Sequence, residues 1–177
     1  MAETEKGEID ILLALYLTEE RKNHFEFTIP YSQESVSVFI NKNNPFPLTK
    51  WDDLTGRTGC TPLGESLGQE LDQFIKEKLT VQRADTLKRC LPMLEKERID
   101  YVIFSKYHVG MELRKMNLLD KIEVLPYNMT SEKVYMAFSK KSGFVRLVPK
   151  VNSEIKRLTE DGTIEKLLDK ALTDATE

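Results

Sequence analysis

The sequence predicts an α/β protein with mostly parallel sheets. Short apolar or alternating runs are followed by segments whose apolar residues recur at helical spacing, and this order is typical of strand–helix–strand units. Turns rich in Gly, Pro and Asn separate the segments. Hydrophobic residues make up 40% of the 177 residues, which is enough for a packed core. We therefore expect one ordinary domain or two small lobes.

The N-terminal region is predicted to be rich in strands. Residues 9–15 form an apolar run, which is consistent with a buried parallel strand. Residues 25–29 alternate apolar and polar side chains, as a half-buried strand does, and Pro30 ends the run. Residues 35–40 are β-branched and aromatic, which favours another strand. Residues 41–47 hold three Asn and two Pro and are predicted to be a linker.

The rest of the chain is predicted to alternate brief strands with amphipathic helices. Strands are expected at 58–61, 99–104, 122–125 and 133–138. Helices are expected at 84–96, 109–116, 147–160 and 163–172, and around Leu67, Leu71, Phe74 and Ile75. Pro92 predicts a kink or a late start in the helix that contains it. Asp161-Gly162 is a stop signal between the last two helices.

Charge and composition exclude several classes of function. The chain has 26 Lys+Arg against 29 Asp+Glu, and a formal net charge of −3 argues against binding of nucleic acid through bulk basicity. No apolar run approaches the roughly 20 residues of a membrane-spanning helix. The polar N-terminus predicts no secretion signal in this chain. His24 and His108 lack partners at metal-ligand spacing, so neither a metal nor a cofactor is expected.

The two cysteines, Cys60 and Cys90, fit no zinc or redox motif. We expect two buried free thiols that act as small apolar side chains. The alternative is a single disulfide, which requires an oxidising compartment.

Five short motifs, the first of them made of two segments, follow one another along nearly the whole chain. They are Gly7–Asp10 with Thr18–Arg21 (G-x-x-D … T-x-x-R), Phe25–Tyr31 (F-x-F-x-x-P-Y), Leu54–Arg57 (D-L-x-G-K/R), Glu97–Asp100 (G-R-x-D) and Glu160–Thr163 (x-D-G-T). Together they resemble the bacterial extracellular solute-binding proteins for polar amino acids. The resemblance implies a two-lobed periplasmic-binding-protein type II fold, with two strands that cross between the lobes and a ligand held between them.

The resemblance also implies a division of the chain. Residues 1–35 and 136–177 would form part of lobe one, and residues 36–135 would form lobe two. In the family, two further strand–helix units normally precede the segment that matches Gly7, so the first lobe is expected to be incomplete. A sheet without its first strands exposes an edge and an apolar face. We therefore expect either a compensating homodimer, in a swapped or an unswapped form, or an altered function.

Arg21 is the first candidate site residue. The matching Arg of the family binds the α-carboxylate of the ligand, because a guanidinium fork pairs with both carboxylate oxygens. The alternative is a surface Arg paired with Glu19 or Glu20. Thr18 belongs to the same motif and is included in the predicted ligand set. Tyr16 could stack on a ligand, although a place in the core is the simpler interpretation.

Ser66 and Ser105 are the candidates in the predicted second lobe. The family uses a Ser or Thr at the position of Ser66 for the α-carboxylate; the alternative is that Ser66 only caps the following helix. Ser105 falls where the family has an Asp that takes the ligand's α-ammonium group, and a hydroxyl cannot neutralise an ammonium as a carboxylate does. Tyr107 and His108 are expected at the surface, with a place beside the ligand as the alternative.

The resemblance predicts a solute-binding protein that captures a polar amino acid or a related small carboxylate for ABC-type uptake. Its partners would be the small ligand and an ABC-transporter permease, and its location the periplasm. The alternative is a degenerate or truncated module for sensing or protein association. An enzyme on the same fold ranks last, because no catalytic pattern is recognisable.

Overall fold

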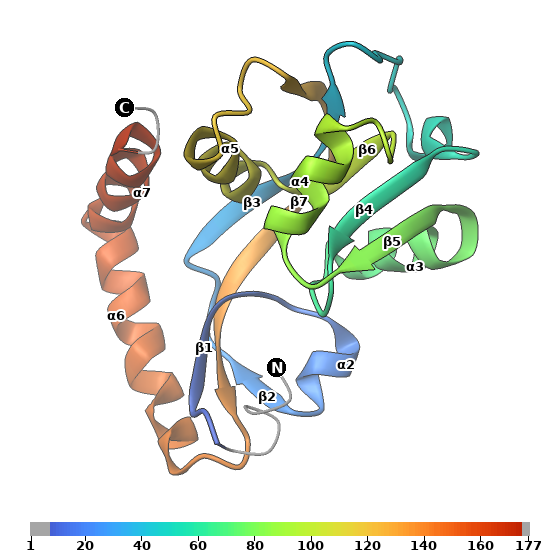
Figure 1. The fold of residues 1–177 in the computed structure, drawn as a ribbon. Helices are drawn as coiled ribbons and strands as arrows, with labels where there is room; N and C mark the ends of the chain where they lie inside the picture. The colour runs from blue at the N-terminus through green and yellow to red at the C-terminus, as the bar shows by residue number, and fades with distance from the viewer. Residues whose placement is uncertain (1–7, 175–177) are drawn as a thin grey trace. The chain divides into compact units, whose positions relative to one another are not determined.

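The computed structural model describes residues 8–174, and the chain divides into two compact units (Figure 1). Unit 1 comprises Met1–Gln33 and Lys133–Glu177, and unit 2 comprises Glu34–Glu132. The chain enters unit 2 in strand β3 (Ser32–Asn41) and returns to unit 1 in strand β7 (Ile122–Ser139).

The sheet of unit 2 is mixed. Its strand order is β7-β3-β6-β4-β5, where β4 is Thr58–Pro62, β5 is Thr80–Ala84 and β6 is Tyr101–Ser105. Strand β4 pairs in parallel with both β5 and β6, whereas β3 pairs antiparallel with β6, with Val36 opposite Ser105. The predicted α/β class is therefore confirmed, but parallel pairing is less general than the sequence suggested.

Three helices and one short 3-10 turn complete unit 2. They are η1 (Trp51–Leu54), α3 (Gln69–Lys78), α4 (Leu87–Glu95) and α5 (Lys106–Lys115). Helix α4 starts at Leu87 and not at Ala84, because residues 80–84 pair with β4 as a strand that the sequence did not reveal. Buried residues of α4, α5 and four strands form one apolar core, which includes Phe39, Cys60, Cys90, Leu91, Leu94, Val102, Val109, Leu113 and Ile122.

Unit 1 contains a small antiparallel sheet centred on the end of β7. Strands β1 (Ile11–Tyr16) and β2 (Phe25–Phe27) both pair antiparallel with β7, and helix α2 (Glu19–Lys22) connects them. The prediction of a buried parallel strand at residues 9–15 is wrong, because β1 is antiparallel and Leu13 is 66% exposed. A small apolar core of Leu15, Phe25 and Ala137 lies in this sheet.

The C-terminal part of unit 1 is helical. A 3-10 turn, η2 (Gly143–Leu147), leads into α6 (Val148–Glu160), and α7 (Thr163–Asp174) follows. The predicted break at Asp161-Gly162 is confirmed: Gly162 has φ +74°, a conformation that favours glycine, and the Asp161 carboxylate accepts the Thr163 N–H at 2.9 Å. Among the described helices, none is both long and apolar enough to cross a membrane.

Strand β7 is continuous over residues 122–139, whereas the sequence predicted two separate strands at 122–125 and 133–138. The intervening residues keep the extended conformation through contacts with other parts of unit 2. The Ser37 hydroxyl donates to the Asn128 side-chain oxygen at 3.1 Å, and the Thr130 hydroxyl donates to the Leu67 carbonyl at 3.2 Å. These contacts come from residues distant in sequence, so no local pattern signals them.

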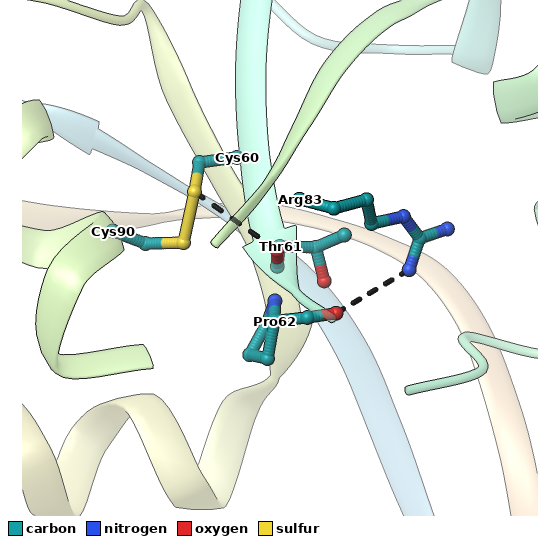
Figure 2. The surroundings of a disulfide bond; sticks show 5 residues. All are labelled: Cys60, Thr61, Pro62, Arg83 and Cys90. Atoms are coloured by element: carbon teal, nitrogen blue, oxygen red, sulfur yellow. Dashed lines mark hydrogen bonds between the residues drawn. A yellow bond between two sulfur atoms is a disulfide. The ribbon is translucent and has the colours of Figure 1, made fainter. Parts of the chain in front are cut away.

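Cys60 and Cys90 form a disulfide that ties β4 to α4 (Figure 2). The prediction of two free thiols is therefore wrong. Both residues are fully buried in the core of unit 2, and their Cα atoms lie 5.7 Å apart. This distance is ordinary for a disulfide. The packing of α4 on the sheet brings together two residues that are 30 positions apart in the chain.

Candidate functional site

The turn after β1 brings Tyr16, Thr18 and Arg21 together in unit 1. The Thr18 hydroxyl accepts the Arg21 N–H at 3.2 Å and so caps α2. The Arg21 side chain is turned back: its Nη1 donates to the Tyr16 carbonyl at 2.8 Å. Arg21 is only 6% exposed, so it does not lie at the surface, as the alternative interpretation required.

This arrangement fixes the direction of the Arg21 guanidinium. A backbone carbonyl at the end of a strand is a rigid acceptor, so the planar fork is oriented before any ligand arrives. A guanidinium of fixed orientation is suited to bidentate pairing with a carboxylate. Tyr16 is itself buried, which fits the core interpretation of its side chain.

Donors of the loop after β4 bind the side-chain carboxylate of Asp72. The Ser66 hydroxyl donates to Asp72 Oδ2, and the Leu67 N–H donates to Asp72 Oδ1 at 2.9 Å. The Gly68 N–H donates to Ser66 Oγ at 3.3 Å. The residue that caps α3 is Gly68, so the interpretation of Ser66 as the N-cap is wrong. The helix begins at Gln69, two residues beyond the predicted Leu67.

A second carboxylate lies against the same loop. Gly68 has φ +101°, and a Cβ at this position would collide with the Glu132 carboxylate. Burial, and to a lesser degree the neighbouring Asp72 and Glu70, raise the pKa of Glu132. A ligand carboxylate that used the donors of this loop would therefore have to displace Asp72 from Ser66 and Leu67.

Ser105 lies at the centre of a second polar cluster in unit 2. It caps α5: its Oγ accepts the His108 N–H at 3.1 Å. The same hydroxyl donates to Glu34 Oε1 and lies 2.9 Å from His108 Nδ1. His108 Nδ1 is 3.5 Å from Glu34 Oε1. The register explains the approach of Glu34, because Val36 is opposite Ser105 and Glu34 lies on the same face two residues earlier.

The cluster couples a carboxylate to an imidazole. The bonded Glu34 carboxylate raises the pKa of His108, burial opposes this shift, and Glu65 and Glu112 add to it more weakly. Ser105 is 3% exposed, whereas the side chains of Glu34 and His108 are 18% and 49% exposed. The carboxylate contacts the hydroxyl directly, so this is not a nucleophile relay, in which the imidazole stands between the two.

The structure thus groups the predicted residues into two sets. Tyr16, Thr18 and Arg21 meet in unit 1. Ser105 is the last residue of β6, and Ser66 lies in the loop after β4. These strands are parallel neighbours, so both residues lie toward the carboxyl ends of the strands of the unit 2 sheet. Sequence reasoning missed Glu34, because only the strand register brings a residue 71 positions away to Ser105.

Similar proteins are known from their sequences. The chain is 27% identical over 172 residues to the probable amino-acid-binding protein YxeM of Bacillus subtilis (strain 168), with 96% of this chain and 64% of that protein covered. It is 23% identical over 174 residues to the L-cystine-binding protein TcyJ of Escherichia coli (strain K12), with 96% and 62% covered. The chain therefore spans less than two thirds of the length of these curated relatives.

Solved structures show the same fold. An ABC-transporter substrate-binding protein, AbpA from Streptococcus pneumoniae bound to L-arginine, gives a TM-score of 0.81 at 18% identity and covers 99% of this chain and 73% of its own. The GluR0 ligand-binding core in complex with L-glutamate gives 0.79 at 19% identity, with 97% and 76% covered. The predicted periplasmic-binding-protein type II fold is confirmed, as a part of the longer chains. Residues 1–174 match one family over nearly the whole sequence, and this chain belongs to the bacterial extracellular solute-binding proteins, family 3.

Proposed function

We propose that this chain binds a polar amino acid or a related small carboxylate and serves ABC-type uptake. The observation that carries the proposal is the family match over residues 1–174, with relatives that are named for the binding of amino acids or L-cystine. We place the protein in the periplasm or at the cell exterior. The buried disulfide supports this location, because disulfides persist in oxidising compartments.

In unit 1, the proposed carboxylate anchor is Arg21. The Tyr16 carbonyl orients its guanidinium, and Thr18 holds the short helix that carries it. A preoriented, largely buried guanidinium loses little side-chain entropy when a carboxylate binds, so more of the interaction energy contributes to affinity. Tyr16 has a supporting role here: its backbone carbonyl positions Arg21, and its side chain packs in the unit.

In unit 2, Ser66 is the proposed ligand contact, and Ser105 is a proposed positioning residue. Ser66 would exchange its bond to Asp72 for a bond to the ligand. Ser105 is almost fully buried and is held by α5, so we assign it the positioning of neighbouring groups. Units 1 and 2 would correspond to the partial first lobe and the second lobe of the family. A permease partner and a homodimer complete the proposal, and no catalytic activity is included.

Thermal unfolding of the full chain against the standard amino acids and L-cystine tests the proposal. A ligand at 100 times its Kd stabilises the folded state by about 2.7 kcal/mol. For a protein of this size, that corresponds to a rise in Tm of roughly 5–10 °C. A selective rise supports binding, and Arg21→Lys should reduce it while the exposed Lys22→Gln control retains it. No rise with any compound would contradict the proposal, and self-association in sedimentation would then favour a sensing or association module.

A further inference from the structure

Two of the contacts of the Glu34 carboxylate, with Ser105 and with His108, differ in permanence. Ser105 Oγ–H points at it from a buried position at the start of α5, so this contact is set by the fold. His108 approaches the same oxygen at 3.5 Å from a side chain that is about half exposed. An exposed imidazole can change rotamer at little cost, whereas a buried cap residue cannot. Of these two contacts, Ser105 is therefore a fixed donor and protonated His108 is a replaceable cation.

The surrounding charges favour a cation at this place. Glu65, in the loop after β4, and Glu112, on α5, act on His108 in the same direction as Glu34. Glu112 also pairs with Lys115 at 3.0 Å and lies 3.9 Å from Lys88 of α4. The aromatic ring of Tyr107 also contacts the imidazole of His108, with 5.9 Å between the two ring centroids.

We propose that Glu34 receives the ammonium group of the amino-acid ligand, and that His108 competes with the ligand for this carboxylate. The inference rests on the proposed function, because an amino acid supplies the ammonium group. Beyond that function, it assigns the ammonium group to Glu34 and makes His108 its competitor. Ser105 then acts as a positioning residue, since its hydroxyl orients the Glu34 oxygen that both cations would use.

The competition gives ligand binding a definite pH dependence. A free amino acid keeps its ammonium and carboxylate charges from about pH 5 to about pH 7.5. The ordinary pKa of an imidazole, about 6.5, lies in this range, and the bonded Glu34 carboxylate raises the pKa of His108. As pH falls through that pKa, His108 takes up a proton from solvent and holds Glu34 more strongly. Only the molecules in which protonated His108 does not hold Glu34 can bind the ligand. The apparent affinity falls in proportion to the fraction of such molecules, by up to about tenfold per pH unit.

Two measurements on the full chain test the inference. The first is a titration of the His108 imidazole by NMR in the absence of ligand, in the wild type and in Glu34→Gln. The second is calorimetric titration with the standard amino acids and L-cystine at about pH 5, 6.5 and 7.5. His108→Gln removes the competitor at a half-exposed position, and His24→Gln is the matched control on the other histidine, which is exposed in unit 1.

We expect Glu34→Gln to lower the pKa of His108 and to weaken binding by about tenfold or more at pH 7.5. His108→Gln should restore tight binding at pH 5 and remove the pH dependence. His24→Gln should have the same affinity and the same pH dependence as the wild type. The inference would be overturned if His108→Gln bound the ligand with the same pH profile as the wild type, or if Glu34→Gln bound it with undiminished affinity. Either result would leave the proposed function intact. If no compound binds at any pH, both fail. Trp51 fluorescence checks that each variant is folded.

Discussion

The Cys60–Cys90 disulfide should contribute strongly to the stability of unit 2. It closes a loop between residues 30 positions apart, and in the chain-entropy account such a loop lowers the entropy of the unfolded chain. For a loop of this length, the expected contribution is about 3.6 kcal/mol. That is a large part of the 5–15 kcal/mol by which a typical domain is stable. Loss of this bond should therefore bring unit 2 close to the limit of folding.

Reduction is the cleanest perturbation, because both sulfur atoms remain in the core as thiols. The protein is unfolded in urea with a reductant, refolded, and compared with the oxidised form by urea titration. Trp51 is the only Trp of the chain and lies in unit 2, where its Nε1–H donates to the Met129 carbonyl at 3.0 Å. Its fluorescence therefore reports on the unfolding of the unit that holds the disulfide. The midpoint should fall by roughly 2 M urea.

A loss of less than about 1 kcal/mol would refute the reasoning. It would mean that the unfolded chain is already restricted between Cys60 and Cys90, so that the covalent link removes little further entropy. Cys60→Ala/Cys90→Ala is the control. It should lose the same amount plus about 1 kcal/mol for the atoms missing from the core, and its stability should not respond to the reductant.

Three further variants test the candidate residues. Gly68→Ala should cost about 2–3 kcal/mol, because φ +101° with ψ 143° is close to a conformation that essentially only glycine adopts, and the Glu132 carboxylate that the new Cβ meets must also move. Gly64→Ala, with φ +76° and open space around it, should cost about 1 kcal/mol, and equal losses in urea titration would contradict this difference. Asp72→Asn should tighten the binding of a carboxylate ligand by about tenfold in calorimetry, because a weaker acceptor then competes for the donors of its loop; unchanged affinity would exclude that loop from the ligand site. Arg21→Lys should weaken the same ligand by about tenfold or more through loss of the planar fork, and full affinity would exclude Arg21 as the anchor.

Local sequence patterns were sufficient to predict the amphipathic helices, which bury one face, and the break between the last two of them. The apolar spacing in residues 87–94 predicted α4, and the Asp161-Gly162 signal predicted the break between α6 and α7. Strand β5 has no such signal, because Thr80–Ala84 is short and is mostly exposed at the edge of the sheet. Its pairing with β4 and not its own side chains makes it a strand.

The candidate site shows the same division. The T-x-x-R motif located Arg21 and the residue that caps its helix, because the contacts lie within five positions of each other. Glu34 escaped notice because its contact with Ser105 depends on the register of β3 against β6. Asp100 is an intermediate case. The G-R-x-D motif drew attention to it, but its contact is distant in sequence: its carboxylate accepts the Thr58 N–H at 2.7 Å where β4 begins.

The candidate groups of unit 2 already have partners within the chain. Ser66 and the Leu67 N–H hold Asp72, and Glu34 holds Ser105 and His108. A ligand that uses these groups exchanges one set of polar contacts for another, so its affinity is the difference between the two. Variants that weaken an internal partner should therefore tighten binding, whereas variants that remove the shared group should weaken it. This opposition of sign separates competition from a purely structural role, since structural damage lowers affinity in both cases.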